Sequence, residues 1–117
     1  MIVISLNVYS GRPDPSWCLS SSQFEDFVEY LRTHSEPSEM TTDQFNKSRP
    51  VLGFRGFTLH NTNEGWLYYI HNSHVTYQES FSGIPSISKC RGVELFLKNM
   101  APSEVLMAHP HAFAQIK

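Results

Sequence analysis

Three side chains suited to ligand recognition lie close together near the start of the chain, in the segment "VYSGRPDPSW" (residues 8–17). Arg12 and Asp14 offer charged hydrogen-bonding groups, and Trp17 offers a large apolar surface. The two prolines fix φ and push the residues before them towards extended geometry, so the segment is ordered before any ligand binds. We expect a recognition loop. The alternative is a stiff connector that leads from a strand into a helix, with Trp17 capping the core.

A second arginine, Arg55, stands between Gly53 and Gly56 in the segment "LGFRGF" (residues 52–57). Glycine inside a strand often marks a bulge or a close approach of two backbones. An arginine at such a point suits a bidentate anion, for example a carboxylate or a phosphate. If Arg12 and Arg55 meet in one cleft, the sequence predicts a site for an anion or a peptide terminus. The alternative is a bulged strand with a solvated arginine.

The two motifs together also carry a family resemblance. "NVYSGRPDPSW" (residues 7–17) with "LGFRGF" (residues 52–57) resembles a family of small, largely uncharacterised proteins. Its members begin with a strand followed by Ser-Gly-Arg-Pro-(Asn or Asp)-Pro-x-Trp and carry a later Gly-(aromatic)-Arg-Gly-Phe. The match covers a small part of the chain. The resemblance implies no activity, and it adds weight to these positions.

Four of the six histidines form two closely spaced pairs. His71 and His74 are at i, i+3, whereas His109 and His111 are at i, i+2, a spacing that points both rings to the same side of an extended chain. Four histidines, or two with a carboxylate, would suit zinc, copper or iron. The alternative is that these are turn and tail histidines that are hydrogen-bonded or solvated.

Signature motifs of catalysis are absent from the sequence. It contains no Gly-x-Ser-x-Gly, no Walker loop, no Rossmann glycine pattern, no HExxH and no CxxC. Cys18 and Cys90 are the only cysteines, and two cysteines make no disulfide framework. We expect free thiols that pack as small hydrophobic groups. The sequence leaves open whether the protein is an enzyme and indicates no particular cofactor.

Hydrophobic periodicity predicts the elements that must position these groups. Apolar and polar residues alternate over residues 2–9, which predicts a strand. Capping-box spacing of Ser22 and Glu25, followed by an apolar stripe at helical spacing, predicts a helix over residues 22–34. The polar, aperiodic residues 35–50 predict a long loop that is either a lid or a surface excursion.

The remainder predicts a β-meander followed by helices. Strands are expected over residues 51–60, 66–72 and 73–80, followed by a turn-rich connector over residues 82–88. Helices are expected over residues 93–100 and 101–109, and an extended tail over residues 109–117. The order is therefore strand, helix, long loop, meander and helices. This order predicts an α+β fold, in which two or three helices pack on one face of a small, mostly antiparallel sheet.

Composition and net charge limit the kinds of protein that this chain can be. A chain of 117 residues with 40% hydrophobic and 17% charged residues predicts a single globular domain over residues 1–117. The net charge of −2, with scattered basic residues, argues against nucleic acid and anionic membrane partners. The apolar stretches are too short to span a bilayer, and the chain start lacks the features of a signal peptide. We therefore expect a soluble, cytoplasmic protein.

Three functions from different classes fit these observations. The favoured one is a small soluble binding module that recognises a small anionic ligand or a protein segment through Arg12, Asp14, Trp17 and Arg55. The second is a small metal-dependent enzyme that uses the four paired histidines. The third is a structural or self-assembling protein, for example a homodimer, whose aromatic strands pair edge to edge.

Overall fold

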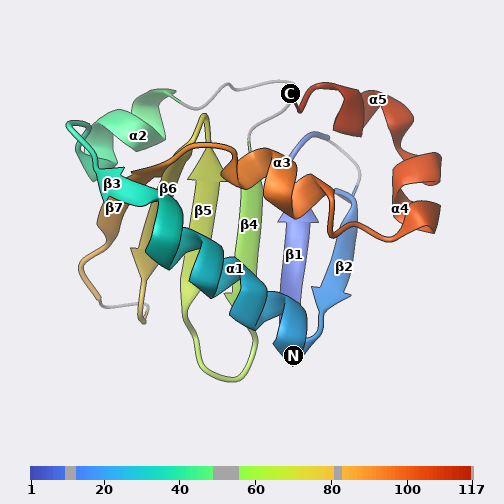
Figure 1. The fold of residues 1–117 in the computed structure, drawn as a ribbon, viewed down its shortest axis with the longest axis horizontal. Coiled ribbons are helices and arrows are strands. Elements are labelled where there is room, and N and C mark those ends of the chain that lie inside the picture. Colours follow the sequence, from blue (N-terminus) through green and yellow to red (C-terminus); the bar gives the residue numbers. More distant parts are fainter. Residues whose placement is uncertain (10–12, 49–55, 81–82, 117) are drawn as a thin grey trace.

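The computed structural model describes residues 1–9, 13–48, 56–80 and 83–116. Within these residues the chain forms one seven-stranded sheet in which every neighbouring pair of strands is antiparallel, together with five helices (Figure 1). The strands are β1 (Ile2–Leu6), β2 (Ser16–Leu19), β3 (Ser35–Pro37), β4 (Phe57–Asn61), β5 (Leu67–His71), β6 (His74–Gln78) and β7 (Ser86–Cys90). The helices are α1 (Ser21–His34), α2 (Thr42–Ser48), α3 (Val93–Lys98), α4 (Ser103–Ala108) and α5 (Pro110–Ala114). The predicted α+β class is confirmed.

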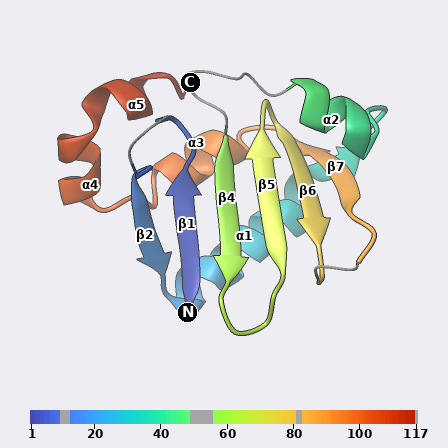
Figure 2. The ribbon, with the colours of Figure 1, turned by 180° about the vertical axis from the view of Figure 1, so that it is seen from behind.

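The strands lie in the order β2-β1-β4-β5-β6-β7-β3. Helices α1 and α3 cross one face of this sheet (Figure 1), and the view from behind shows the opposite face with both helices beyond it (Figure 2). We call this opposite face the open face. Because successive side chains of a strand point to opposite faces, each strand supplies alternate residues to the core under α1 and α3. The fully buried side chains of this core include Ile4, Leu6, Phe27, Phe57, Leu59, Ile70, Val93 and Leu97.

Helix α1 begins two residues earlier than its predicted cap implied. Ser20 is the N-cap, and its hydroxyl accepts from the Gln23 amide while the Gln23 side chain accepts from the Ser20 amide. This reciprocal pair satisfies two of the amide groups that the start of a helix leaves unpaired. Ser22 and Glu25 therefore lie within the helix rather than forming its cap.

The expectation of a structureless loop over residues 35–50 is wrong for residues 35–48. Ser35–Pro37 forms the edge strand β3, paired with β7, and Thr42–Ser48 forms α2. A capping box starts α2, because Thr41 and Gln44 exchange side-chain to amide hydrogen bonds of 3.1 and 2.9 Å. Phe45 is only 1% exposed, so α2 is packed and is not a free surface segment.

Two further expectations about the second half are corrected. The connector over residues 82–88 includes the start of strand β7, and the tail expected to be extended contains helix α5. Helices α4 and α5 pack beside β2 at one end of the sheet (Figures 1 and 2), where Phe113 and Ile116 join the core. None of the helices in the described ranges has the length and apolar character needed to cross a bilayer.

Candidate functional site

The segment "VYSGRPDPSW" connects two strands and not a strand and a helix. Strand β2 pairs antiparallel with β1, with Ile4 opposite Trp17, and the Leu6 amide donates to the Pro15 carbonyl at 2.9 Å. Strands β1 and β2 therefore form a β-hairpin, and we call its described connecting residues, 7–9 and 13–15, the hairpin loop. A four-residue strand leaves little periodic signal, which is why sequence patterning missed β2.

Asp14 stabilises this hairpin loop from inside. Its Oδ1 atom accepts hydrogen bonds from the amides of Val8 at 2.9 Å and Tyr9 at 2.7 Å. Two backbone donors on one carboxylate oxygen are charge-assisted bonds, which are stronger than bonds between neutral groups. The carboxylate of Asp14, which precedes β2, thus binds the amides of Val8 and Tyr9, which follow β1, so it holds the two sides of the loop together.

Trp17 lies in the core and not on the surface. Its side chain is 8% exposed, and its ring contacts Phe113 of α5 with centroids 5.9 Å apart. Among the described residues its Nε1 donor has no hydrogen-bond partner, although it is buried. Trp17 therefore packs β2 against α5. This contact positions the hairpin loop, but the buried Trp17 ring is not exposed to a ligand.

Arg12 and Arg55 lie outside the described residues, but residues that flank the two motifs meet. The Asn7 amide donates to the Gly56 carbonyl at 2.8 Å, and the Asn7 side-chain amide donates to the Thr58 hydroxyl at 2.7 Å. These bonds continue the β1–β4 ladder past the pair Leu6 and Phe57. The end of β1 and the start of β4 are thus adjacent at one end of the sheet.

Gly56 makes this junction possible. Its φ is +103°, and a Cβ atom at this position would lie 2.1 Å from the Ile70 carbonyl oxygen. Only glycine fits such a conformation and such an approach. The close backbone approach that the sequence predicted for a glycine of "LGFRGF" is therefore present at Gly56.

A third segment joins the same end of the sheet. The Tyr9 hydroxyl lies 2.9 Å from Nδ1 of His109, between α4 and α5, and the two rings are 5.6 Å apart. Nothing in the sequence pattern links these two residues. We call Asn7, Tyr9, Asp14, Gly56 and His109 the loop end; its members come from the hairpin loop, the start of β4 and the α4–α5 junction.

The structure does not bring the four paired histidines together. His71 and His74 face each other across the two-residue turn between β5 and β6, whereas His109 contacts Tyr9 and His111 is exposed on α5. Because α5 is helical, His109 and His111 lack the same-side geometry expected of an extended tail. Within the described ranges, no three His, Cys, Asp or Glu side chains are grouped so that they could hold a metal ion.

The aromatic strands expected to pair edge to edge lie inside the sheet. Strands β4, β5 and β6 have a neighbour on both sides, and the sheet edges are the short strands β2 and β3. Strand β3 ends in Pro37, and proline blunts an edge against further pairing. The two cysteines are both free; Cys18 is exposed and Cys90 is buried.

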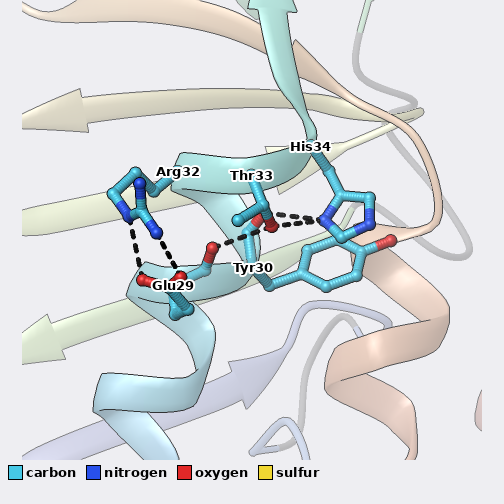
Figure 3. A network of polar contacts seen from close by, with 5 residues as sticks. All are labelled: Glu29, Tyr30, Arg32, Thr33 and His34. Atoms are coloured by element: carbon cyan, nitrogen blue, oxygen red, sulfur yellow. Dashed lines mark hydrogen bonds and ion pairs between the residues drawn. The ribbon is translucent and has the colours of Figure 1, made fainter.

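A second polar cluster lies on the last turns of α1 (Figure 3). Arg32 pairs with Glu29 through its Nε and Nη2 atoms, and this hydrogen bond holds the pKa of Glu29 below its usual value. Thr33 donates to the Glu29 carbonyl, while His34 stacks on Tyr30 with centroids 4.1 Å apart. These contacts are within one helix, so they stabilise its end.

Comparisons with protein-family models, with curated proteins and with solved structures found no match to this chain. The family resemblance therefore remains an expectation that depends on the residues of the two motifs.

Proposed function

We propose that this protein is a small binding module that recognises an anion, a carboxylate or a phosphate, at the loop end. The observation that supports the proposal is the hydrogen bond from the Asn7 amide to the Gly56 carbonyl at 2.8 Å. It joins the residues that flank the two arginine motifs, so the chain reaches Arg12 and Arg55 from neighbouring strand ends. Two guanidinium groups on such a frame are the donors that carboxylates and phosphates prefer.

Hydrogen bonds and core packing hold the described frame together, which favours binding. The Asp14 carboxylate holds the Val8 and Tyr9 amides, and Trp17 fastens β2 in the core. A frame that is ordered before binding loses less conformational entropy when a ligand arrives. In this proposal Asp14 and Trp17 position the site, and Arg12 and Arg55 contact the ligand.

Calorimetric titration with phosphate and with citrate tests the proposal. We expect one of the two anions to bind wild-type protein and the variants Arg12→Ala and Arg55→Ala each to weaken that binding by about tenfold or more. Arg91→Ala is the matched control, because Arg91 is exposed at the β7–α3 turn and its backbone carbonyl, which the substitution keeps, accepts from Tyr30.

A peptide with a free carboxyl terminus, compared with its amidated form, distinguishes a protein segment from a small molecule as the source of the anion. Loss of binding on amidation would identify the peptide terminus. If no anion binds, or if the three arginine variants weaken binding equally, the proposal is wrong.

A further inference from the structure

A row of charged and titratable side chains crosses the open face at the edge opposite to the hairpin loop. Strand pairing sets His74 of β6 beside Lys89 of β7, and Lys89 beside Glu36 of β3. The neighbouring Val75 and Cys90 are buried in the core, so these three residues point to the open face. Directly paired residues have Cβ atoms about 5 Å apart, so an imidazole, an ammonium and a carboxylate follow one another.

This row forms the floor of a hollow of about 770 Å³ between the sheet edge and α2. Figure 2 shows α2 close to the ends of β6 and β7 on this side of the molecule. The hollow is lined by Glu36, Pro37, Glu39, Met40, Gln44, His74 and Lys89. Its volume falls within the range of about 300 to 1,000 Å³ that is usual for small-molecule sites.

The charged side chains that line the hollow form no ion pairs with one another. Among the described residues the structure contains one ion pair, between Arg32 and Glu29. Lys89, Glu36 and Glu39 therefore form no ion pair with another described residue. His74 Nδ1 lies 3.0 Å from the Asn72 carbonyl oxygen, and since a carbonyl only accepts, Nδ1 carries the proton. In the neutral ring the other nitrogen, Nε2, is then an acceptor.

We propose that this hollow binds a small zwitterion, a free α-amino acid. The carboxylate of the amino acid would pair with the Lys89 ammonium, and its own ammonium would pair with Glu36. An anion alone would be repelled by Glu36 and Glu39, and a cation alone would leave the Lys89 ammonium without a partner, whereas a zwitterion pairs with both signs of charge. Pro37 and Met40 supply an apolar wall against which an aliphatic side chain can pack.

Titration of the full chain, followed by the chemical shifts of its backbone amides, tests this proposal with leucine as the probe. We expect saturable shifts in β3, β7 and the start of α2, with a dissociation constant of about 1 mM or tighter. Isopentylamine lacks the carboxylate and 4-methylpentanoate lacks the ammonium, and each should bind at least about tenfold more weakly. These analogues test the wild-type protein, so the result does not depend on how a variant folds.

Two variants test which side chain pairs with each charged group of leucine. Lys89→Gln and Glu36→Gln should each weaken leucine binding by about tenfold, because each removes one of the two ion pairs. Lys98→Gln on α3 and Glu104→Gln on α4 remove the same charges away from the hollow and should leave binding unchanged. The proposal is overturned if leucine produces no saturable shifts, if the amine binds as tightly as leucine, or if the control variants weaken binding equally.

Discussion

The hydroxyl of Tyr30 occupies the space that a side chain on Gly92 would need. A Cβ atom at Gly92 would lie 2.7 Å from the Tyr30 oxygen, and Gly92 has a φ of +78°. The same hydroxyl donates to the Arg91 carbonyl at 2.7 Å, and the Tyr30 ring stacks on Phe96 with centroids 4.4 Å apart. Tyr30 therefore joins α1 to the start of α3, and glycine is required where the two meet.

We expect Gly92→Ala to lower the free energy of unfolding by about 2 kcal/mol, since the new methyl group meets the Tyr30 hydroxyl and the backbone is strained at positive φ. Tyr30→Phe removes the hydroxyl, so the double variant should lose less stability than the sum of the two single variants. Urea unfolding of all four proteins measures this coupling. Strict additivity would show that the two residues do not interact.

Gly56→Ala should be much more damaging than Gly65→Ala. Both glycines have positive φ, but a Cβ at Gly56 would lie 2.1 Å from the Ile70 carbonyl oxygen, whereas nothing lies within 4 Å at Gly65. We expect a loss of about 1 kcal/mol at Gly65 from backbone strain alone, and at least about 3 kcal/mol at Gly56. Chemical denaturation of the two variants gives the comparison, and equal losses would contradict the close approach of β4 and β5.

Asp14→Ala should destabilise the hairpin loop. It removes the acceptor of the Val8 and Tyr9 amides, so we expect a loss of about 2 kcal/mol in the free energy of unfolding. Asp14→Asn keeps an acceptor oxygen and should lose less. Urea unfolding measures both variants. If alanine and asparagine cost the same, the carboxylate oxygen does not hold the loop.

The two cysteines should react at very different rates. Cys18 is exposed, whereas Cys90 is 0% exposed and burial raises the pKa of its thiol, opposed in part by a hydrogen bond with Ser35. Because the thiolate is the reactive form, native protein should take up one equivalent of iodoacetamide quickly and the second only after unfolding. Mass spectrometry counts the labels, with Cys18→Ser as the control that should remain unlabelled while native. Rapid double labelling would contradict the burial of Cys90.

Stability should fall at strongly alkaline pH because of Tyr68. Burial, with a smaller contribution from Tyr77, raises the pKa of Tyr68 from 10.0 to about 12. The folded state therefore holds the phenol proton of Tyr68 more tightly than the unfolded state does. The resulting contribution to the free energy of unfolding is complete below pH 10.0 and is lost as the pH rises to about 12. Urea midpoints across this range should fall less steeply for Tyr68→Phe, with Tyr69→Phe on the open face as the control. Identical slopes for wild type and Tyr68→Phe would exclude this source.

The elements predicted well from the sequence are those with a local signal. Phe24, Phe27 and Leu31 repeat at helical spacing, and Val75 and Tyr77 alternate with polar residues, so α1 and β6 are readable from periodicity alone. The capping box of Thr41 and Gln44 is also local, and it could have identified α2. Strands β2 and β3 have four and three residues, which is too short for a period to be recognised.

The candidate sites depend on contacts between residues that are distant in the chain. The sequence by itself determined the α+β class, the proline-restricted geometry of the segment that follows the first strand and the charges available, because propensity, proline geometry and titratable groups belong to single residues or short segments. Only the tertiary structure decided that Asn7 meets Gly56 and that Lys89 stands between His74 and Glu36. Strand order and register decide these meetings, and both follow from how the whole chain buries its apolar faces and pairs its backbone.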